Sequence, residues 1–162
     1  MRKNKTYTWL TLLIVLGYLL YQVLSGSALF TNKKDASLIS CVDGDTMVLM
    51  IENKSEKVRL LAVDTPERNQ PYYRVASDFT CNLLKDSTTL QIEMDKNATY
   101  DSYERLLAWV WVDDELLQSR LVGYGLAKVA YLYDEYKYTS QLQNIQQQAK
   151  FKKINLWSLP NP

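Results

Sequence analysis

The chain has 162 residues, the length of one ordinary domain, and with 47% hydrophobic and 23% charged residues it lacks the composition of a disordered protein. It contains no histidine, which excludes enzymes with an imidazole base and zinc sites with a histidine ligand. Three of the 19 basic residues lie within the first five positions, so the rest of the chain, with 16 basic and 18 acidic residues, has a net charge of −2. This charge gives no support to a nucleic-acid partner, and any such function requires a local site.

The amino-terminal segment has the features of a membrane-targeting sequence. No charged residue occurs in 6–32, and the strongly apolar run 9–24 follows a basic amino terminus. Such a run is typical of a secretory signal, and the uncharged residues beside it make it long enough for a spanning helix. We expect residues 1–32 to be a signal anchor, or a signal peptide cleaved after the small residues 25–28. Both interpretations place the rest of the chain outside the cytoplasm, either anchored in the cell membrane or secreted; a buried helix of the domain is the third interpretation.

After a short polar linker at residues 33–37, the pattern alternates between strands and helices. The predicted strands are residues 38–42, 46–51, 57–63, 88–94 and 106–112, with turns at 43–45 and 53–55. The predicted helices are residues 72–85, 115–124 and 135–151, with an apolar connection at 125–131. The apolar face of the first helix is expected to consist of Tyr72, Val75, Ala76, Phe79 and Leu83.

Five strands interleaved with helices in about 130 residues suit a small closed barrel such as the OB-fold. The predicted fold class is therefore α+β, mainly β: a five-stranded OB-fold barrel with three helices, preceded by an amino-terminal hydrophobic helix. A flat α+β sandwich is the alternative. The domain is expected to cover residues 38–158, with Trp157 packing its carboxyl-terminal end and a tail at 159–162.

The two cysteines lie in predicted elements of different kinds. Cys41 falls in a predicted strand, and Cys81 falls off the apolar face of a predicted helix. An extracytoplasmic location would permit a disulfide between them. We nevertheless expect two independent free thiols and keep the disulfide as the alternative.

The densest polar cluster of the body follows the third predicted strand. Asp64, Thr65 and Glu67 surround a proline there, and Asp45 ends an Asp-Gly-Asp turn 19 residues upstream. The strand meander could place Asp45 beside Asp64, and two carboxylates with backbone carbonyls and water form an oxygen site suited to Ca²⁺ or Mg²⁺. Taken separately, each motif is an ordinary turn, and their coincidence is what indicates a site.

Five motifs occur in the order and spacing of a known family. They are Cys41-Val-Asp-Gly-Asp-Thr46, Val58-Arg-Leu-Leu-Ala-Val-Asp-Thr-Pro-Glu67, Asp101-Ser-Tyr-Glu-Arg-Leu-Leu-Ala108, Gly125-Leu-Ala-Lys-Val-Ala-Tyr-Leu-Tyr133 and Asn155-Leu-Trp-Ser158. Through these motifs the chain resembles the staphylococcal nuclease (thermonuclease) family over about residues 38–158. The resemblance implies an OB-fold enzyme that hydrolyses DNA and RNA with Ca²⁺ and little sequence specificity, leaving 3′-phosphate products. We expect it to be a monomer.

The resemblance also implies the role of individual residues. Asp45 and Asp64 would bind Ca²⁺ through carboxylates and Thr65 through its backbone carbonyl, Glu67 would be the general base, Arg59 and Arg105 would bind the scissile phosphate, and Tyr103, Tyr131 and Tyr133 would line the nucleotide pocket. The chemistry agrees, because a cation and two guanidinium groups stabilise the charge that develops on a phosphodiester under attack. No step of this scheme requires histidine.

Three departures from the family pattern lower the positive potential of the body. The stretch after Glu67 is shorter and lacks the family's lysines, Ser102 replaces a lysine that often contacts phosphate, and Glu104 replaces a glycine. We expect Glu104 either to pair with Arg105 and weaken the phosphate clamp, or to form an ion pair on the outer surface. The alternative functions are a non-catalytic OB-fold module that binds single-stranded nucleic acid or a protein at the cell surface, and a calcium-binding protein with acidic loops. The presence of Glu67 argues against the binding module.

Overall fold

The computed structural model describes residues 13–17 and 32–160 of the chain. The chain divides into two units, Met1–Thr31 and Asn32–Pro162. In the first unit, residues 13–17 are helical. In these described residues no helix has the length and apolar character needed to cross a membrane. Most of the predicted targeting segment lies outside the described residues, as does the end of the predicted tail 159–162.

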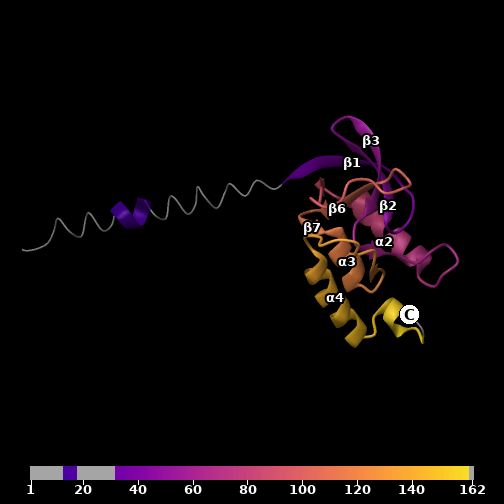
Figure 1. Cartoon of the computed structure of the whole chain (residues 1–162). Coiled ribbons are helices and arrows are strands. Elements are labelled where there is room, and N and C mark those ends of the chain that lie inside the picture. Colours follow the sequence, from indigo (N-terminus) through magenta and orange to yellow (C-terminus); the bar gives the residue numbers. More distant parts are fainter. Residues whose placement is uncertain (1–12, 18–31, 161–162) are drawn as a thin grey trace, which may run out of the picture. The chain divides into compact units, whose positions relative to one another are not determined.

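The second unit is built on a closed barrel of five strands (Figure 1). Strand β1 pairs with β2 on one side and with β5 on the other, and β2–β3 and β5–β6 complete four antiparallel pairs. A parallel pairing between β3 and β6 closes the barrel. The strands are β1 Lys33–Cys41, β2 Thr46–Ile51, β3 Lys54–Leu60, β5 Leu90–Glu93 and β6 Leu106–Val112. The predicted five-stranded barrel is confirmed.

Three helices and short elements complete the described part of this unit. The helices are α2 Tyr73–Asp86, α3 Leu117–Gly123 and α4 Thr139–Phe151, of which α3 and α4 lie side by side (Figure 1). The short elements are β4 Val63–Asp64, β7 Glu115–Leu116, β8 Lys128–Val129 and the 3₁₀ helix η1 Asn155–Ser158. Trp157 of η1 is half-buried as expected, with Lys150 Nζ 4.6 Å from its ring centroid.

Three strands, β1, β3 and β5, have other boundaries than predicted. Strand β3 begins three residues early, at Lys54, and β5 is shorter than residues 88–94, but the largest differences are at the start of β1 and the end of β3. Residues 33–37, predicted as a linker, form the first half of β1, because Lys33 to Asp35 pair with β5 and the next two residues pair with β2. Strand β3 ends at Leu60 rather than at residue 63. Ala62 has a positive φ of 62° that breaks the strand, and Val63 and Asp64 then pair with β8 instead. Backbone hydrogen bonding, which hydrophobic pattern does not report, decides both boundaries.

The predicted apolar face of α2 is rotated in the structure. Val75, predicted to be buried, has half of its surface exposed, whereas Ala76, Thr80 and Leu84 are the buried residues. Thr80 was not included in the predicted buried face, because that face was chosen from apolar residues only. Its hydroxyl donates a hydrogen bond of 2.7 Å to the carbonyl of Gly44, which makes its burial acceptable.

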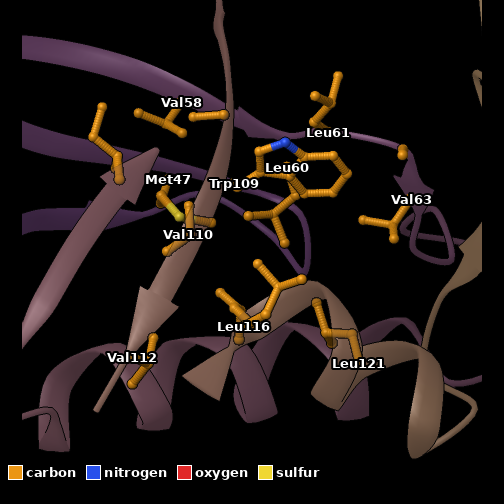
Figure 2. Packing of buried hydrophobic residues seen from close by; sticks show 14 of the residues in the cluster. Met47, Val58, Leu60, Leu61, Val63, Trp109, Val110, Val112, Leu116 and Leu121 are labelled. Carbon is orange, nitrogen blue, oxygen red and sulfur yellow. The ribbon is translucent and has the colours of Figure 1, made fainter. Parts of the chain in front are cut away.

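The core fills the barrel and the space between the barrel and the helices. Figure 2 shows Trp109 of β6, which is fully buried, among the aliphatic side chains of this cluster. Its indole Nε1 donates to Asp95 at 3.0 Å, so the one polar atom of the ring is satisfied. Leu117 and Leu121 of α3 and Leu142 of α4 belong to the same cluster, and each contributes roughly 1.5–3 kcal/mol by its burial.

The two cysteines form a disulfide, so the expectation of free thiols is wrong. Cys41 ends β1 and Cys81 lies in the middle of α2, with Cα atoms 5.8 Å apart. The apolar face of α2 did not reveal this contact, because Cys81 points to the strand end from the edge of that face. In the chain-entropy model, closing a ring across 40 residues stabilises the fold by about 4 kcal/mol.

Candidate active site

The barrel brings the predicted site residues to one pocket. The pairing of β2 with β3 sets Thr46 opposite Arg59, and the parallel pairing of β3 with β6 sets Arg59 beside Leu107, just past Arg105. A cavity of about 490 Å³ lies there. Eight of the nine predicted site residues line it, namely Asp45, Arg59, Asp64, Glu67, Tyr103, Arg105, Tyr131 and Tyr133. The ninth, Thr65, is buried behind Asp45 and is bonded to it.

Arg59 joins the two predicted metal-binding carboxylates. Its Nη1 lies 3.0 Å from Asp45 Oδ2, and its Nη2 lies 3.3 Å from Asp64 Oδ1. Nη1 also donates to the backbone carbonyl of Val63 at 3.0 Å. The side chain is 9% exposed, so these partners replace water around a buried charge. Arg59 therefore holds both carboxylates together. We call these three residues, Asp45, Arg59 and Asp64, the floor of the pocket.

Asp45 is the most buried acid that lines the pocket. Its Oδ2 accepts hydrogen bonds from the Thr65 amide at 2.8 Å and the Thr65 hydroxyl at 2.7 Å. Its Oδ1 accepts one from the Thr46 hydroxyl at 3.2 Å. Burial raises the pKa of Asp45 to about 6, although Arg59 and the Thr65 bonds act in the opposite direction. The same bonds fix the Asp45 carboxylate relative to Thr65, whose carbonyl is the third predicted ligand.

The donor set of this floor fits a hard cation. Asp45 and Asp64 both form ion pairs with the guanidinium group of Arg59. Burial disfavours the ionised form of Asp45, so a further positive charge beside it would be stabilising. Among the described residues there is no cluster of three or more acidic, cysteine or histidine side chains that could hold a metal alone. Two carboxylates, a backbone carbonyl and water are the kind of oxygen ligands that Ca²⁺ accepts.

Arg105 has a partner that the sequence did not suggest. Asp101 Oδ2 lies 2.7 Å from its Nε and 2.6 Å from its Nη2, and Asp101 Oδ1 accepts from the amides of Tyr103 and Arg105. Desolvation raises the pKa of Asp101, but these hydrogen bonds outweigh it and lower the pKa overall. Asp101 thus orients both the guanidinium and the loop that carries it. A carboxylate four residues before an arginine in a turn was the available signal.

Neither expected pairing of Glu104 is present among the described residues. Arg105 pairs with Asp101, and Glu104 is exposed with a φ of 60°. This left-handed conformation explains why glycine suits the position, because a side chain is strained there.

Glu67 lines the pocket from the loop after Pro66. Its amide donates to Gln70 Oε1 at 2.9 Å, and the amide of Gln70 donates to its carbonyl at 2.8 Å. The shortened stretch after Glu67 therefore closes as a compact turn that leads into α2, and the side chain of Glu67 is exposed.

The predicted tyrosines form the rim of the pocket. Tyr103 and Tyr133 are 78% and 83% exposed, so their rings are available to a ligand. Tyr131 lies deeper: its hydroxyl donates to Asp64 Oδ1 at 3.4 Å, and the nearby carboxylate raises its pKa. Tyr136, which the sequence did not single out, is buried and lines the same pocket. Its burial shows that not every tyrosine of this segment is a rim residue.

The pocket and the barrel agree with a comparison of the sequence with protein families. The family model described as "Staphylococcal nuclease homologue" matches residues 57–159. The chain belongs to the staphylococcal nuclease family.

Individual relatives agree with this membership. The chain is 40% identical over 131 residues to the SPbeta prophage-derived endonuclease YokF and to the endonuclease YncB, both of Bacillus subtilis. Each alignment covers 76% of this chain, but only 44% of YokF and 62% of YncB, so the chain spans less than two thirds of these relatives. It is 32% identical over 167 residues to the thermonuclease of Staphylococcus intermedius, covering 96% of this chain and 98% of that protein.

Proposed function

We propose that the chain is a Ca²⁺-dependent nuclease that hydrolyses phosphodiester bonds of DNA and RNA with little sequence specificity. The observation that carries this proposal is the carboxylate pair Asp45 and Asp64, held by Arg59 in the pocket that Glu67 and Arg105 also line. The endonuclease and thermonuclease relatives support the same reaction class.

Three residues would hold the cation. Asp45 and Asp64 would bind Ca²⁺ through their carboxylates and Thr65 through its backbone carbonyl, with water as the remaining ligands. The bound cation supplies positive charge at the scissile phosphate. Asp45 is fixed for this by its bonds to Thr65, and Asp64 by Arg59 and the hydroxyl of Tyr131.

Glu67 would act as the general base. It is exposed at the edge of the pocket and so can reach a water molecule bound beside the phosphate. Its carboxylate takes a proton from this water, the water oxygen bonds to phosphorus, and the bond from phosphorus to the 5′-oxygen breaks, after which the leaving 5′-oxygen takes a proton from solvent water. The products are a 3′-phosphate and a 5′-hydroxyl.

Arg105 and Arg59 would both stabilise the negative charge that develops on the phosphate, each from a different position. Arg105 is oriented by Asp101 and is 24% exposed, so its free donors can meet the equatorial phosphate oxygens. Arg59 contributes positive charge from the floor of the pocket, where it also neutralises the two carboxylates. The rings of Tyr103 and Tyr133 would stack on bases, and stacking accepts every base.

We also propose that the domain acts outside the cytoplasm as a monomer, either anchored by its amino-terminal segment or secreted after cleavage. The Cys41–Cys81 disulfide supports this location, because such bonds persist in oxidising compartments. The intact mass of the protein isolated from cells distinguishes the two forms: a mass lower by the first 25–30 residues means cleavage. Light scattering of the purified domain tests the monomer.

The central experiment is digestion of heat-denatured DNA and of RNA with Ca²⁺ or with EGTA. We expect cleavage only with Ca²⁺, and a loss of about 10²–10⁴-fold in kcat for Glu67→Gln, the range typical of a general base. Glu52→Gln, a change in the exposed β2–β3 turn, is the matched control and should keep full activity. Products should become substrates for polymerase extension only after phosphatase treatment. Chelator-insensitive cleavage contradicts the calcium assignment, and nucleic-acid binding without cleavage favours the non-catalytic module.

A further inference from the structure

We infer that helix α2 positions Asp45 for cation binding through two adjacent links to the turn before it, the Cys41–Cys81 disulfide and the hydroxyl of Thr80. This inference rests on the proposed Ca²⁺ site. It makes Thr80 and the disulfide positioning groups for the proposed reaction, although none of them lines the pocket.

The turn that carries Asp45 is short and internally bonded. The amides of Val42 and Asp43 both donate to the carbonyl of Thr46 at 3.1 Å. Asp43 Oδ1 accepts in return from the amides of Asp45 at 3.1 Å and Thr46 at 2.8 Å. Residues 42–46 therefore form one internally bonded unit, so contacts that hold this turn also hold Asp45.

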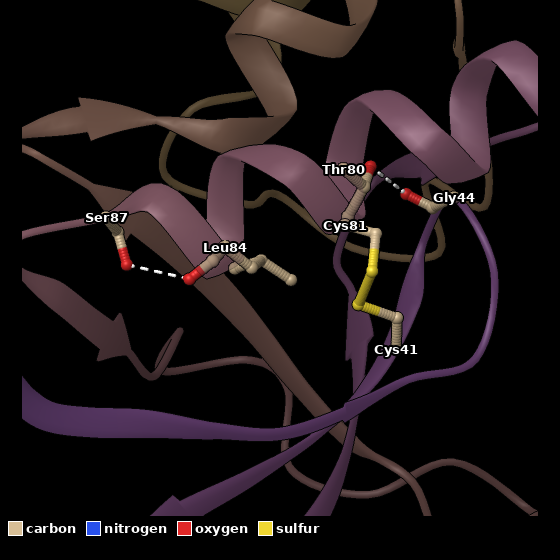
Figure 3. The surroundings of a disulfide bond; sticks show 6 residues. All are labelled: Cys41, Gly44, Thr80, Cys81, Leu84 and Ser87. Carbon is tan, nitrogen blue, oxygen red and sulfur yellow. Dashed lines mark hydrogen bonds between the residues drawn. A yellow bond between two sulfur atoms is a disulfide. The ribbon is translucent and has the colours of Figure 1, made fainter.

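Helix α2 holds the unit at both ends (Figure 3). Cys41, directly before the turn, is bonded to Cys81. Gly44, directly before Asp45, accepts a 2.7 Å hydrogen bond from the Thr80 hydroxyl, which is fully buried. The two attachments come from consecutive residues of one helix, so α2 fixes both the place and the tilt of the turn.

Thr65 confines the same turn where it faces the site. A Cβ atom added to Gly44 would lie 2.8 Å from Thr65 Oγ1, so turn and Thr65 are in contact with no space between them. Asp45 Oδ2 bonds to the amide and the hydroxyl of Thr65. The turn is thus clamped between α2 and Thr65. Release of the α2 attachments would let it withdraw and would separate two of the three proposed ligands.

The disulfide also closes a ring that contains most of the proposed site. Between Cys41 and Cys81 lie Asp45, Arg59, Asp64, Thr65 and Glu67, and of the six residues proposed for metal binding and catalysis only Arg105 lies outside. Opening the ring should therefore loosen the cation ligands more than it affects the arginine that meets the phosphate. The expected effect falls on Ca²⁺ affinity and leaves the chemical step at saturating Ca²⁺ largely intact.

The test measures Ca²⁺ binding by titration calorimetry and amide hydrogen exchange of residues 42–46, in the wild type, Cys41→Ser/Cys81→Ser, Thr80→Val and Thr80→Ser. We expect Thr80→Val to bind Ca²⁺ about tenfold more weakly, the effect of one lost buried hydrogen bond. The cysteine double variant, which loses the other attachment, should also bind Ca²⁺ more weakly, and both should exchange faster in the turn. Thr80→Ser keeps the hydroxyl and should bind within about twofold of the wild type. The kcat at saturating Ca²⁺ should stay within about twofold in all of them. Thr80→Val keeps the disulfide and therefore tests the inference even if the cysteine variant does not fold.

Leu142→Ala is the matched control, because it removes a fully buried side chain of a different helix, α4. It should lower the melting temperature and leave Ca²⁺ affinity unchanged. Unchanged affinity and exchange in Thr80→Val, or equal weakening in Leu142→Ala, overturns the inference alone. A wild type that binds no Ca²⁺ overturns the proposed function, and the inference with it.

Discussion

The pocket has a buried floor and an exposed rim, and its two arginines differ accordingly. On the floor, Arg59 contacts two carboxylates and has 9% of its side chain exposed. On the rim, Arg105 contacts one carboxylate, that of Asp101, and has 24% exposed. Both are predicted to act on the same phosphate, but only Arg59 also pairs with a buried acid, Asp45, whose side chain is 8% exposed. We therefore expect Arg59 to stabilise the fold and Arg105 to contribute little to its stability.

The largest effect is expected from Arg59→Ala. It leaves the buried carboxylate of Asp45 without its ion pair, and breaking such a pair costs about 3–5 kcal/mol of unfolding free energy. Urea unfolding measures this loss, and activity should disappear with it. The double variant Arg59→Ala/Asp45→Asn should recover part of the stability, because no buried charge remains unpaired. If the unfolding free energy of Arg59→Ala is within about 0.5 kcal/mol of that of the wild type, the buried pair of Arg59 and Asp45 does not stabilise the fold as expected.

Arg105→Ala should separate activity from stability. We expect kcat/KM to fall by about 10²–10³-fold, the usual loss when one preorganised stabiliser of transition-state charge is removed. The unfolding free energy should change by at most about 1 kcal/mol, because the Asp101 pair is partly exposed. Lys85→Ala, an exposed change in the last turn of α2, serves as the control. If Arg105→Ala lowers the unfolding free energy as much as Arg59→Ala does, the two arginines do not differ in their contribution to stability.

In calcium-free protein, the unfolding free energy should depend on pH through the buried carboxyl group of Asp45. The pKa of Asp45 is raised by burial from 3.8 to about 6, so the folded state binds its proton more tightly than the unfolded chain does. The stabilising contribution is complete below about pH 4 and is lost as the pH rises through 6, by up to about 3 kcal/mol. Asp45→Asn should lack this decline in urea unfolding between pH 4 and 7. Saturating Ca²⁺ should restore stability at pH 7 in the wild type only.

The rim tyrosines should contribute to substrate binding alone. Tyr133→Ala removes a ring that is 83% exposed, which should raise KM by the equivalent of about 1–3 kcal/mol and leave kcat nearly unchanged. Steady-state kinetics on single-stranded DNA measures this split. Tyr124→Ala, an exposed tyrosine outside the pocket, should leave both constants unchanged. A fall in kcat with constant KM would place Tyr133 in the chemistry.

The smallest effect is expected from Glu104→Gly. The residue has a φ of 60°, and release of this strain should raise the unfolding free energy by about 0.5–1 kcal/mol. Glu104→Gln changes the charge and keeps the strain, so it should leave stability unchanged. Thermal unfolding of both variants distinguishes the two causes.

The predicted site residues could be chosen from the sequence because they cluster in short motifs. Eight of the nine predicted residues line one pocket, since the strand ends that carry Asp45, Arg59 and Asp64 meet when the barrel closes. The partners of the arginines were not accessible. The Arg105–Asp101 pair was not predicted, although both residues belong to one motif. Glu104, which was expected to form an ion pair, is exposed with a positive φ and has no ion pair among the described residues. Such a backbone conformation is a property of the folded turn.

By itself, the sequence determined the alternation of strands and helices, the membership of a family and which residues make up the candidate site, because these depend on residue type and spacing. The tertiary structure alone decided that residues 33–37 extend β1, that Arg59 bridges two carboxylates, and that Cys41 meets Cys81. Each of these depends on contacts between segments distant in the chain. Such contacts arise from how α2 and the barrel pack together, and local patterns carry no record of that packing.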